Sequence, residues 1–476
     1  MRAAVPLLAL LIPAAAPSVV GAAEIGDERA VSRHLDHAGI ARGEVAIEEV
    51  IAHGRLLFEA RFTTLDGAGR PGATGADIPT RRPGEANPAF LRTSGPDASA
   101  CAGCHNQPEA GGAGDFVANV FFAPQDIEYD FESIAPELAM ERGTTALFGA
   151  GLLELLGREM TRDLHALRDE AAARARATGE PVRVRLITKG VDFGWLRADP
   201  DGFLDLGGIE GIHPDLVVKP FSQKAAFASL RQFSINALNM HHGLQAEERF
   251  GLRWTGDPDF DRDGIQAELS GGDLTALTLF QATLPLPRRV LPDEPALREA
   301  AVAGEALFDQ VGCTACHRLA LPLESAVFSE PGGYHPAGQL RASDGPVVEV
   351  DLGAWFDLER DADGRLLVPA FTDLKRHVIA DARHPHFANE RLSQNFVPRD
   401  VFRTAPLWGA GSTAPYGHRG DLTTLSEAIL AHGGEAADSR AAFEQLDPQG
   451  QGRIVEFLKS LQIDPLLAAE HAALTR

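Results

Sequence analysis

Two short segments, Cys101-Ala-Gly-Cys104-His105 and Cys313-Thr-Ala-Cys316-His317, decide how this chain is interpreted. Together they use all four cysteines of the sequence, and a histidine directly follows each pair. Two thiols at this spacing can each form a thioether with a vinyl group of haem, and the adjacent His can bind the iron. The two pentads therefore predict two covalently bound haem c groups, with His105 and His317 as iron ligands.

Other uses of cysteine explain the pattern less well. A disulfide framework does not need a His after each pair, and a thioredoxin-type pair needs a βαβ context that the sequence lacks. A structural zinc site remains the third alternative.

The N-terminus has the pattern of a secretory signal. Arg2 is followed by the apolar stretch 5–20 and by small residues up to Ala23. We expect residues 1–23 to be a signal peptide and the mature protein to be periplasmic. The alternatives are an uncut hydrophobic anchor or a buried helix.

The length and the charge of the chain limit its domain number and its possible partners. A chain of 476 residues exceeds the size at which one core stops growing, so we expect two domains, 24–291 and 292–476. The net charge of −23 argues against nucleic acid as a partner. No apolar run in the mature chain is long enough for a transmembrane segment.

A weak repeat precedes the two pentads. The sequence Gly-x-x-x-Phe occurs at Gly54–Phe58 and again at Gly304–Phe308, each time with Leu before the Phe. We expect a mainly α protein made of two cytochrome c-like domains with long loops and a small β element, 182–187, in the first. The helix 452–461 should pack on the helix 296–308.

The second axial ligand decides whether each haem transfers electrons or reacts. Only four methionines occur, and none lies beyond Met240, so we expect the sixth ligand of the second domain's haem, if it has one, to be His. His418 and His432 flank the expected helix 422–431 and are the best placed. For the first haem, His241 or His242 is the candidate; alternatively, it has no sixth protein ligand.

Several segments resemble the bacterial dihaem oxidoreductases, often labelled thiol oxidoreductases, which are related to dihaem cytochrome c peroxidases. The resemblance covers about residues 44–463. It implies His432 as distal ligand of the second haem, because it stands fourteen residues after His418 of Pro415-Tyr-Gly-His418-Arg419-Gly420. Arg419 replaces the Asp of the peroxidases, and their distal His soon after the first pentad is missing. The other segments are 193–195, 219–221 with 227–228, 239–243, 373–377, 403–409, 425–429 and 432–436.

Further residues are assigned to the haem surroundings. Arg403, Trp408 and His418 are candidate cofactor-binding residues, and Trp408 is a candidate for transfer between the haems or for plain core packing. Glu154 is a candidate proton-transfer residue over an open haem, or an ordinary helix charge.

A separate acidic loop, 257–264, alternates carboxylates before a Gly. Its side chains Asp259, Asp261 and Asp263 form a candidate calcium site, although the loop is not a full EF-hand. The alternative is an ordinary polar turn that binds no ion.

These features predict an exported dihaem oxidoreductase with peroxidase-like chemistry at the first haem, where His241 is a candidate catalytic residue. The expected partner is a redox protein, a small cytochrome or cupredoxin, or a small oxidant. The competing hypothesis is a non-catalytic dihaem electron carrier.

Overall fold

The computed structural model describes residues 26–69, 99–114, 117–122, 139–390, 393–394 and 396–464. The expected signal peptide and most of the loop 66–100 lie outside the described residues. Among those that are described, no helix combines the length and the apolar character that crossing a membrane requires.

A close helix pair underlies the first pentad. Helix α2 (Ile47–Glu59) packs on α8 (Gly271–Ala282). Gly54 makes this possible, because a Cβ at that position would lie 2.0 Å from the carbonyl oxygen of Ala276. One turn later, the rings of Phe58 and Phe280 pack at 5.3 Å between centroids. A small residue and an aromatic residue on one face therefore set the distance between the helices.

The second pentad has the same support. Helix α9 (Pro295–Gln310) packs on α12 (Pro448–Ser460), as the sequence predicts. A Cβ on Gly304 would lie 1.9 Å from the Arg453 carbonyl oxygen, and Phe308 packs on Phe457 at 5.4 Å. The repeat seen in the sequence is thus a repeat of packing.

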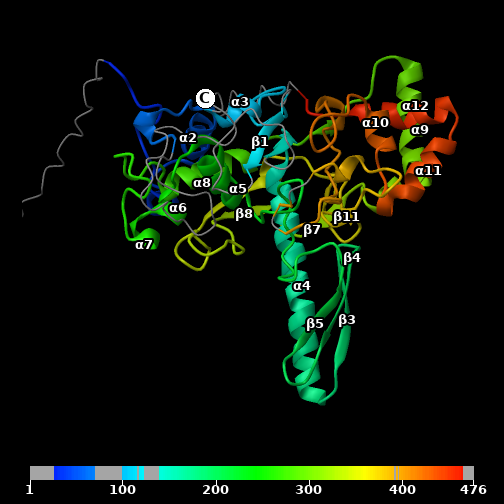
Figure 1. Ribbon diagram of the computed structural model, residues 1–476, viewed down its shortest axis with the longest axis horizontal. Coiled ribbons are helices and arrows are strands. Elements are labelled where there is room, and N and C mark those ends of the chain that lie inside the picture. The colour runs from blue at the N-terminus through cyan, green and yellow to red at the C-terminus, as the bar shows by residue number, and fades with distance from the viewer. Residues whose placement is uncertain are drawn as a thin grey trace, which may run out of the picture.

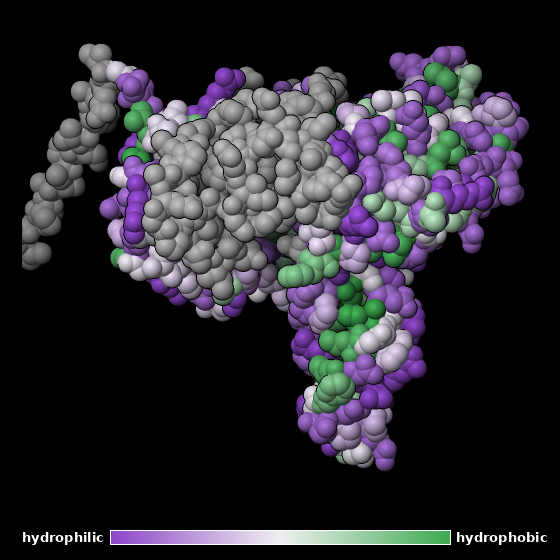
Figure 2. Space-filling model, viewed as in Figure 1, coloured by the Kyte–Doolittle hydropathy of each residue, from purple (hydrophilic) through white to green (hydrophobic). Residues whose placement is uncertain are grey.

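A long arm projects from the body of the molecule (Figure 1). It consists of α4 (Ala150–Thr178) and the antiparallel sheet β3-β4-β5, with strands Val182–Thr188, Val191–Ala198 and Leu204–Ile209. Leu186, Phe193 and Leu196 are buried in the core of the arm; Phe193 and Leu196 both reach it because β4 is irregular between residues 192 and 195. Figure 2 shows apolar residues gathered along the visible side of the arm.

The remaining elements before residue 290 are short and surround α8. Helix α5 and the π-helix η2 pack on each other, and α5 also contacts α8. Their bounds are α1 His37–Ala41, η1 Thr64–Asp66, α3 Cys101–Cys104, β1 Val117–Phe122, β2 Ala139–Gly143, α5 Leu230–Ala237, η2 Leu238–His242, α6 Glu247–Phe250, α7 Leu252–Thr255 and β6 Arg288–Arg289.

The chain after the second pentad forms two-stranded pairs before its last helices. These pairs are β7-β10, β8-β9 and β11-β12, all antiparallel. The bounds are η3 Cys313–Ala315, β7 Leu321–Leu323, β8 Val327–Glu330, β9 Val348–Asp351, η4 Leu352–Ala354, β10 Leu366–Val368, β11 Arg376–Val378, η5 His386–Ala388, β12 Val401–Arg403, η6 Ala410–Ser412, α10 Leu425–Leu430, η7 Gly434–Ala436, α11 Ala437–Gln445 and β13 Leu461–Gln462.

The two halves of the sequence interlock. Strand β7 contacts α4 and β8 contacts α8, so part of the second half lies on the first. Arg231 of α5 and Glu330 of β8, both fully buried, form an ion pair of 2.6 Å across this contact. In addition, β6, just before the expected domain boundary at residue 291, pairs with β13 at the end of the described chain.

The expectation of a mainly α fold is corrected to a mixed fold, with 38% helix and 15% strand. Strands such as β7 and β10 are three residues long and pair across more than forty residues of sequence. Such short segments carry too little periodicity to be recognised before their partners are known. The assignment of two cytochrome c-like domains stays a prediction.

Candidate haem sites

The first pentad places its histidine beside the helix pair. Cys101 and Cys104 are the ends of the one-turn helix α3, and His105 follows it. The His105 ring lies 6.1 Å from that of Phe58. Its Nδ1 lies 3.3 Å from the Gly112 carbonyl oxygen, which can accept a hydrogen bond. Donation from Nδ1 fixes the ring and leaves Nε2 as the nitrogen that can bind iron.

The second pentad repeats this geometry. The His317 ring lies 6.3 Å from that of Phe308, and its Nδ1 lies 3.1 Å from the Phe371 carbonyl oxygen. Burial lowers the pKa of His317 to about 4, and nearby His432 contributes to the shift. A neutral imidazole with a free Nε2 is the form that binds a metal.

The four thiols are not paired as disulfides. Burial raises the pKa of both Cys101 and Cys313 to about 12. A redox-active cysteine needs the opposite shift, towards the thiolate, so these surroundings do not suit disulfide exchange. Their donor set, two thiols and one oriented imidazole in each pentad, fits a haem c attachment.

His432 lies close to the second pentad, with its Nδ1 held by the backbone. It follows α10, and its Nδ1 lies 2.7 Å from the Ala428 carbonyl oxygen. Its ring packs on Phe387 at 5.4 Å, and burial lowers its pKa. His432 therefore matches His317 in having Nδ1 held by the backbone, and it is close enough to influence the titration of His317.

The adjacent histidines near the first pentad occupy different places. Both belong to the π-helix η2, a feature that is frequent at functional sites. The Nε2 of His242 lies 3.6 Å from Cys101 Sγ, and its ring packs on Phe62. Burial, followed by the charges of His242 and His105, lowers the pKa of His241 to about 3. The structure thus brings both histidines to the first pentad.

Trp408 connects the two halves. The residue is buried, and a Cβ on Gly149 would lie 2.5 Å from its ring. Gly149 precedes α4, and the nearby Leu147 amide donates to Gly111, whose own amide donates to the His105 carbonyl. Trp408 of the second half therefore packs against the segment that carries His105.

His418 lies in a buried polar network rather than against a pentad. Its Nε2 lies 2.9 Å from Asn389 Oδ1, and burial lowers its pKa to about 2. Glu390 lies next to it and forms an ion pair with Arg142. Lys224 donates to the carbonyls of residues 398, 399 and 401 from beneath the Phe402 ring. The sequence did not predict this network, because its members lie between Arg142 and His418 and no local pattern joins them.

The other predicted residues of the haem surroundings have protein partners. Arg403 donates to the carbonyl oxygens of Ser222 and Thr404. Both carboxylate oxygens of Glu154 are engaged, one by Arg158 and the other by the Leu230 amide at 2.8 Å. Glu154 thus has a structural role in the buried ion network, and its proposed part in proton transfer stays a prediction.

His377 ends one of the segments of resemblance, 373–377, and its environment differs from that of His432. Both ring nitrogens have carboxylate partners, Asp373 at 2.8 Å and Glu435 at 2.7 Å. The pKa of His377 is raised to about 11 despite burial, through Asp373 and Cys316. A charged imidazole held on both sides cannot donate a lone pair to iron, so His377 is a neighbour of the second pentad rather than an axial ligand.

The acidic loop folds into a compact cluster. One carboxylate oxygen from each of Asp259, Asp261 and Asp263 lies within 4.8 Å of the other two. Burial and then Asp263 raise the pKa of Asp261 to about 8, and Glu268 is also buried with a raised pKa. The fold brings Glu268, which is outside the predicted site, beside the loop. Such a set suits a hard cation with oxygen ligands.

Two solved structures share distant similarity with this chain. Hydrazine synthase from Kuenenia stuttgartiensis, studied under xenon, is 14% identical with a TM-score of 0.36, covering 94% of this chain and 100% of the other. A MauG-like protein associated with microbial copper homeostasis is 17% identical with a TM-score of 0.30, covering 58% and 81%. No curated protein matches in sequence.

A family model supplies the firmer comparison. It matches residues 368–461, the segment from β10 to the end of α12 that contains Trp408, His418 and His432. Its description is "Di-haem oxidoreductase, putative peroxidase". The resemblance predicted from the sequence is confirmed over this segment, which is similar to the di-haem oxidoreductases.

Proposed function

We propose that the protein is an exported dihaem c-type oxidoreductase, in which electron transfer is coupled to peroxidase-like chemistry at the first haem. One observation carries the proposal. Each Cys-x-x-Cys-His pentad lies on the same helix-pair packing, with the histidine ring beside a phenylalanine and its Nδ1 next to a backbone carbonyl. When bound, haem supplies one-electron redox chemistry and, at an open position, reaction with peroxide.

The second site is built for electron transfer. His317 and His432 both direct Nδ1 to the backbone, which keeps both Nε2 atoms available as ligands. Two fixed ligands minimise rearrangement when the iron changes charge. Trp408, packed between this half and the segment bearing His105, is the candidate for passing electrons to the first site.

The first site is the candidate reactive centre. Burial lowers the pKa of His241 to about 3 and keeps the ring neutral, so it can act as a sixth ligand. His242 is held beside Cys101 at the edge of the site. We therefore assign the distal role to His241 and a positioning role to His242.

The partner remains a proposal from the sequence. A net charge of −23 favours a basic redox protein, such as a small cytochrome or a cupredoxin. The predicted signal peptide places this exchange in the periplasm.

The test uses the protein produced with a c-type maturation system. The intact mass should exceed that of the polypeptide by two haems, and the oxidised spectrum should contain one low-spin and one high-spin or weakly ligated haem. Peroxide should be reduced in the presence of a reduced donor. Two low-spin haems without turnover would support the electron carrier instead.

We also propose a calcium ion at Asp259, Asp261 and Asp263. These three carboxylates form one cluster and repel one another and the nearby buried Glu268, and a divalent cation removes that repulsion. Titration of chelated protein with Ca²⁺ should release heat in the wild type but not in Asp261→Asn. Asp293→Asn, at an exposed position, is the matched control. Absence of heat in the wild type would remove this proposal.

A further inference from the structure

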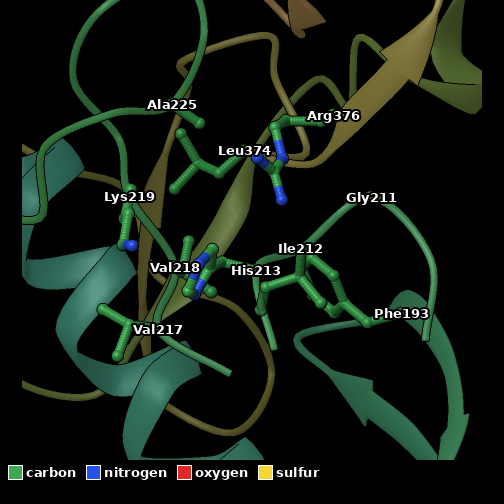
Figure 3. Close-up of a pocket in the computed structure, with 10 residues that line it drawn as sticks. All are labelled: Phe193, Gly211, Ile212, His213, Val217, Val218, Lys219, Ala225, Leu374 and Arg376. Atoms are coloured by element: carbon green, nitrogen blue, oxygen red, sulfur yellow. The ribbon is translucent and has the colours of Figure 1, made fainter. Parts of the chain in front are cut away.

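The arm is fixed to the body of the molecule at its base. The Arg376 amide donates to the Gly211 carbonyl oxygen at 2.9 Å, and Lys375 Nζ donates to the Asp192 carbonyl oxygen at 2.8 Å. Figure 3 shows this joint, with Phe193 of β4 on one side of it and Arg376 on the other. These bonds tie the sheet to the body, from which the rest of the arm projects (Figure 1).

Strand β5 lies at the edge of the sheet that α4 covers least. The order of the strands is β3-β4-β5, and α4 packs chiefly on β3 and β4. Leu204 of β5 pairs with the buried Ala198, so both point to the α4 side of the sheet. Leu204, Leu206 and Ile209 pack against the core of the arm, yet each is only half buried. A row of aliphatic side chains thus stays open beside the helix.

Phe203 extends this row into the turn before β5. The residue is 59% exposed. The turn is ordered, because the Asp199 amide donates to the Phe203 carbonyl oxygen and the Phe203 amide donates to Asp201 Oδ1. Figure 2 shows apolar residues along the visible side of the arm. Such a row marks a contact surface, and we call it the β5 strip: Phe203, Leu204, Leu206 and Ile209.

The charge of the arm decides which partner the β5 strip suits. Residues 150–209 hold nine Lys or Arg and ten Asp or Glu, a net charge of −1, whereas the rest of the chain carries −22. A basic redox protein is attracted to the acidic remainder and not to the arm. Two copies of this chain repel each other through their bodies, but they can approach along their arms, where the charge is nearly balanced.

We propose that the arm joins two copies of this chain, with the β5 strip of one copy packed on the β5 strip of its partner. A twofold axis produces this contact, since one patch then serves both copies. Burial of apolar surface on both strips stabilises it. Side chains make the contact rather than strand pairing, because Asp205 Oδ1 accepts a hydrogen bond from the Gly207 amide at 2.9 Å and interrupts the edge of β5.

Analytical ultracentrifugation of the mature holoprotein tests the proposal without depending on haem activity. We expect a dimer that dissociates on dilution between about 100 and about 1 µM, since the strip is a small interface. The dimer should strengthen as salt is raised from about 0.05 to about 0.5 M, because screening weakens the repulsion between the two acidic bodies. A monomer at about 100 µM would overturn the proposal, and so would a dimer that salt dissociates.

Substitutions locate the contact. Phe203→Ser should weaken dimerisation at least about tenfold, because each dimer loses two apolar rings from its interface. Ile187→Ser is the matched control, since Ile187 is 49% exposed and lies between the buried Leu186 and Thr188, which places it on the outer face of the same sheet. This control should dimerise as the wild type does.

A second variant, Leu206→Arg, places a charge in the middle of the β5 strip at a half-exposed position, and it should abolish the dimer. Haem spectra and melting temperatures equal to those of the wild type show that the variants are folded. The proposal is overturned if Phe203→Ser and Leu206→Arg dimerise as tightly as the wild type does.

Hydrogen exchange of the wild type gives an independent location. The amides of residues 203–209 should exchange more slowly in the dimer than in the diluted monomer, whereas those of β3 should not change. Protection confined to other parts of the chain would mean that the copies meet elsewhere and would overturn the proposal.

Discussion

The two pentads lie on the same helix-pair packing but have different surroundings. Gly54 with Phe58 and Gly304 with Phe308 perform the same task in each half. Beside the first pentad lie two adjacent histidines on a π-helix, whereas beside the second lie His432, after α10, and the charged His377. The common part suits attachment of the cofactor, and the different part suits different chemistry.

Removing one pair of thiols should have the largest effect. Cys313→Ala with Cys316→Ala should lower the intact mass by one haem, and Cys101→Ala with Cys104→Ala should do the same for the other half. The reason is that each thioether needs its own sulfur. Mass spectrometry of denatured protein measures this, and full haem content in either double variant would disprove covalent attachment.

Substitution of the histidine proposed as the distal ligand in each half should then change the spectrum of one haem at a time. His432→Ala should convert one haem to high spin and leave the other unchanged, because the second half has no methionine to replace the lost imidazole. His241→Ala should alter only the other haem. Electron paramagnetic resonance distinguishes the two outcomes.

The matched control for these variants is His213→Ala, since His213 is exposed. If the spectrum of His432→Ala equalled that of this control, another residue would be the ligand.

The shared packing can be broken at its smallest residue. Gly304→Ala places a methyl group 1.9 Å from a backbone oxygen of α12, so it should reduce the free energy of unfolding by about 1–3 kcal/mol. Gly54→Ala should do the same for α2 and α8. Denaturant unfolding followed by far-UV circular dichroism gives the value.

Gly452→Ala in α12 separates packing from helix propensity. A Cβ at this position has no neighbour within 4 Å, so alanine should stabilise the helix by about 0.5–1 kcal/mol. Equal effects of Gly304→Ala and Gly452→Ala would argue against the close contact.

The smallest effect concerns pH. Asp273, in the capping box of α8, binds His34 at 2.6 Å and His53 at 2.9 Å, whereas the cap of α12, Asp447, has no histidine partner in the described chain. The hydrogen bond to Asp273 raises the pKa of His34. The stabilisation that this hydrogen bond gives the folded protein is therefore fully present below about pH 6.5, the usual pKa of His. It is lost as the pH rises through the raised pKa of His34 in the folded protein.

Thermal unfolding at about pH 6 and about pH 9 measures this contribution. The difference between the melting temperatures at the two pH values should be smaller in Asp273→Asn and unchanged in Asp447→Asn. An unchanged difference in Asp273→Asn would place the pH dependence elsewhere.

The sequence alone determined the pentads, the Gly-Phe repeat, the helix pair of the second half and His432 as a candidate. These signals are local, since thiol spacing and the Gly-Phe repeat each lie within about one turn of helix. Helices α9 and α12 were predicted because their apolar periodicity is long enough to be recognised.

Only the tertiary structure decided the rest. The pairing of the short strands, the partners of Glu154 and His418, and the contact between the two halves at Arg231 and Glu330 all join segments far apart in the chain. Burial and pairing of such groups depend on which distant backbone lies beside them, and no local pattern records that. The physical reason is that packing is specified by the whole fold, whereas covalent attachment and helix formation are specified by neighbours in sequence.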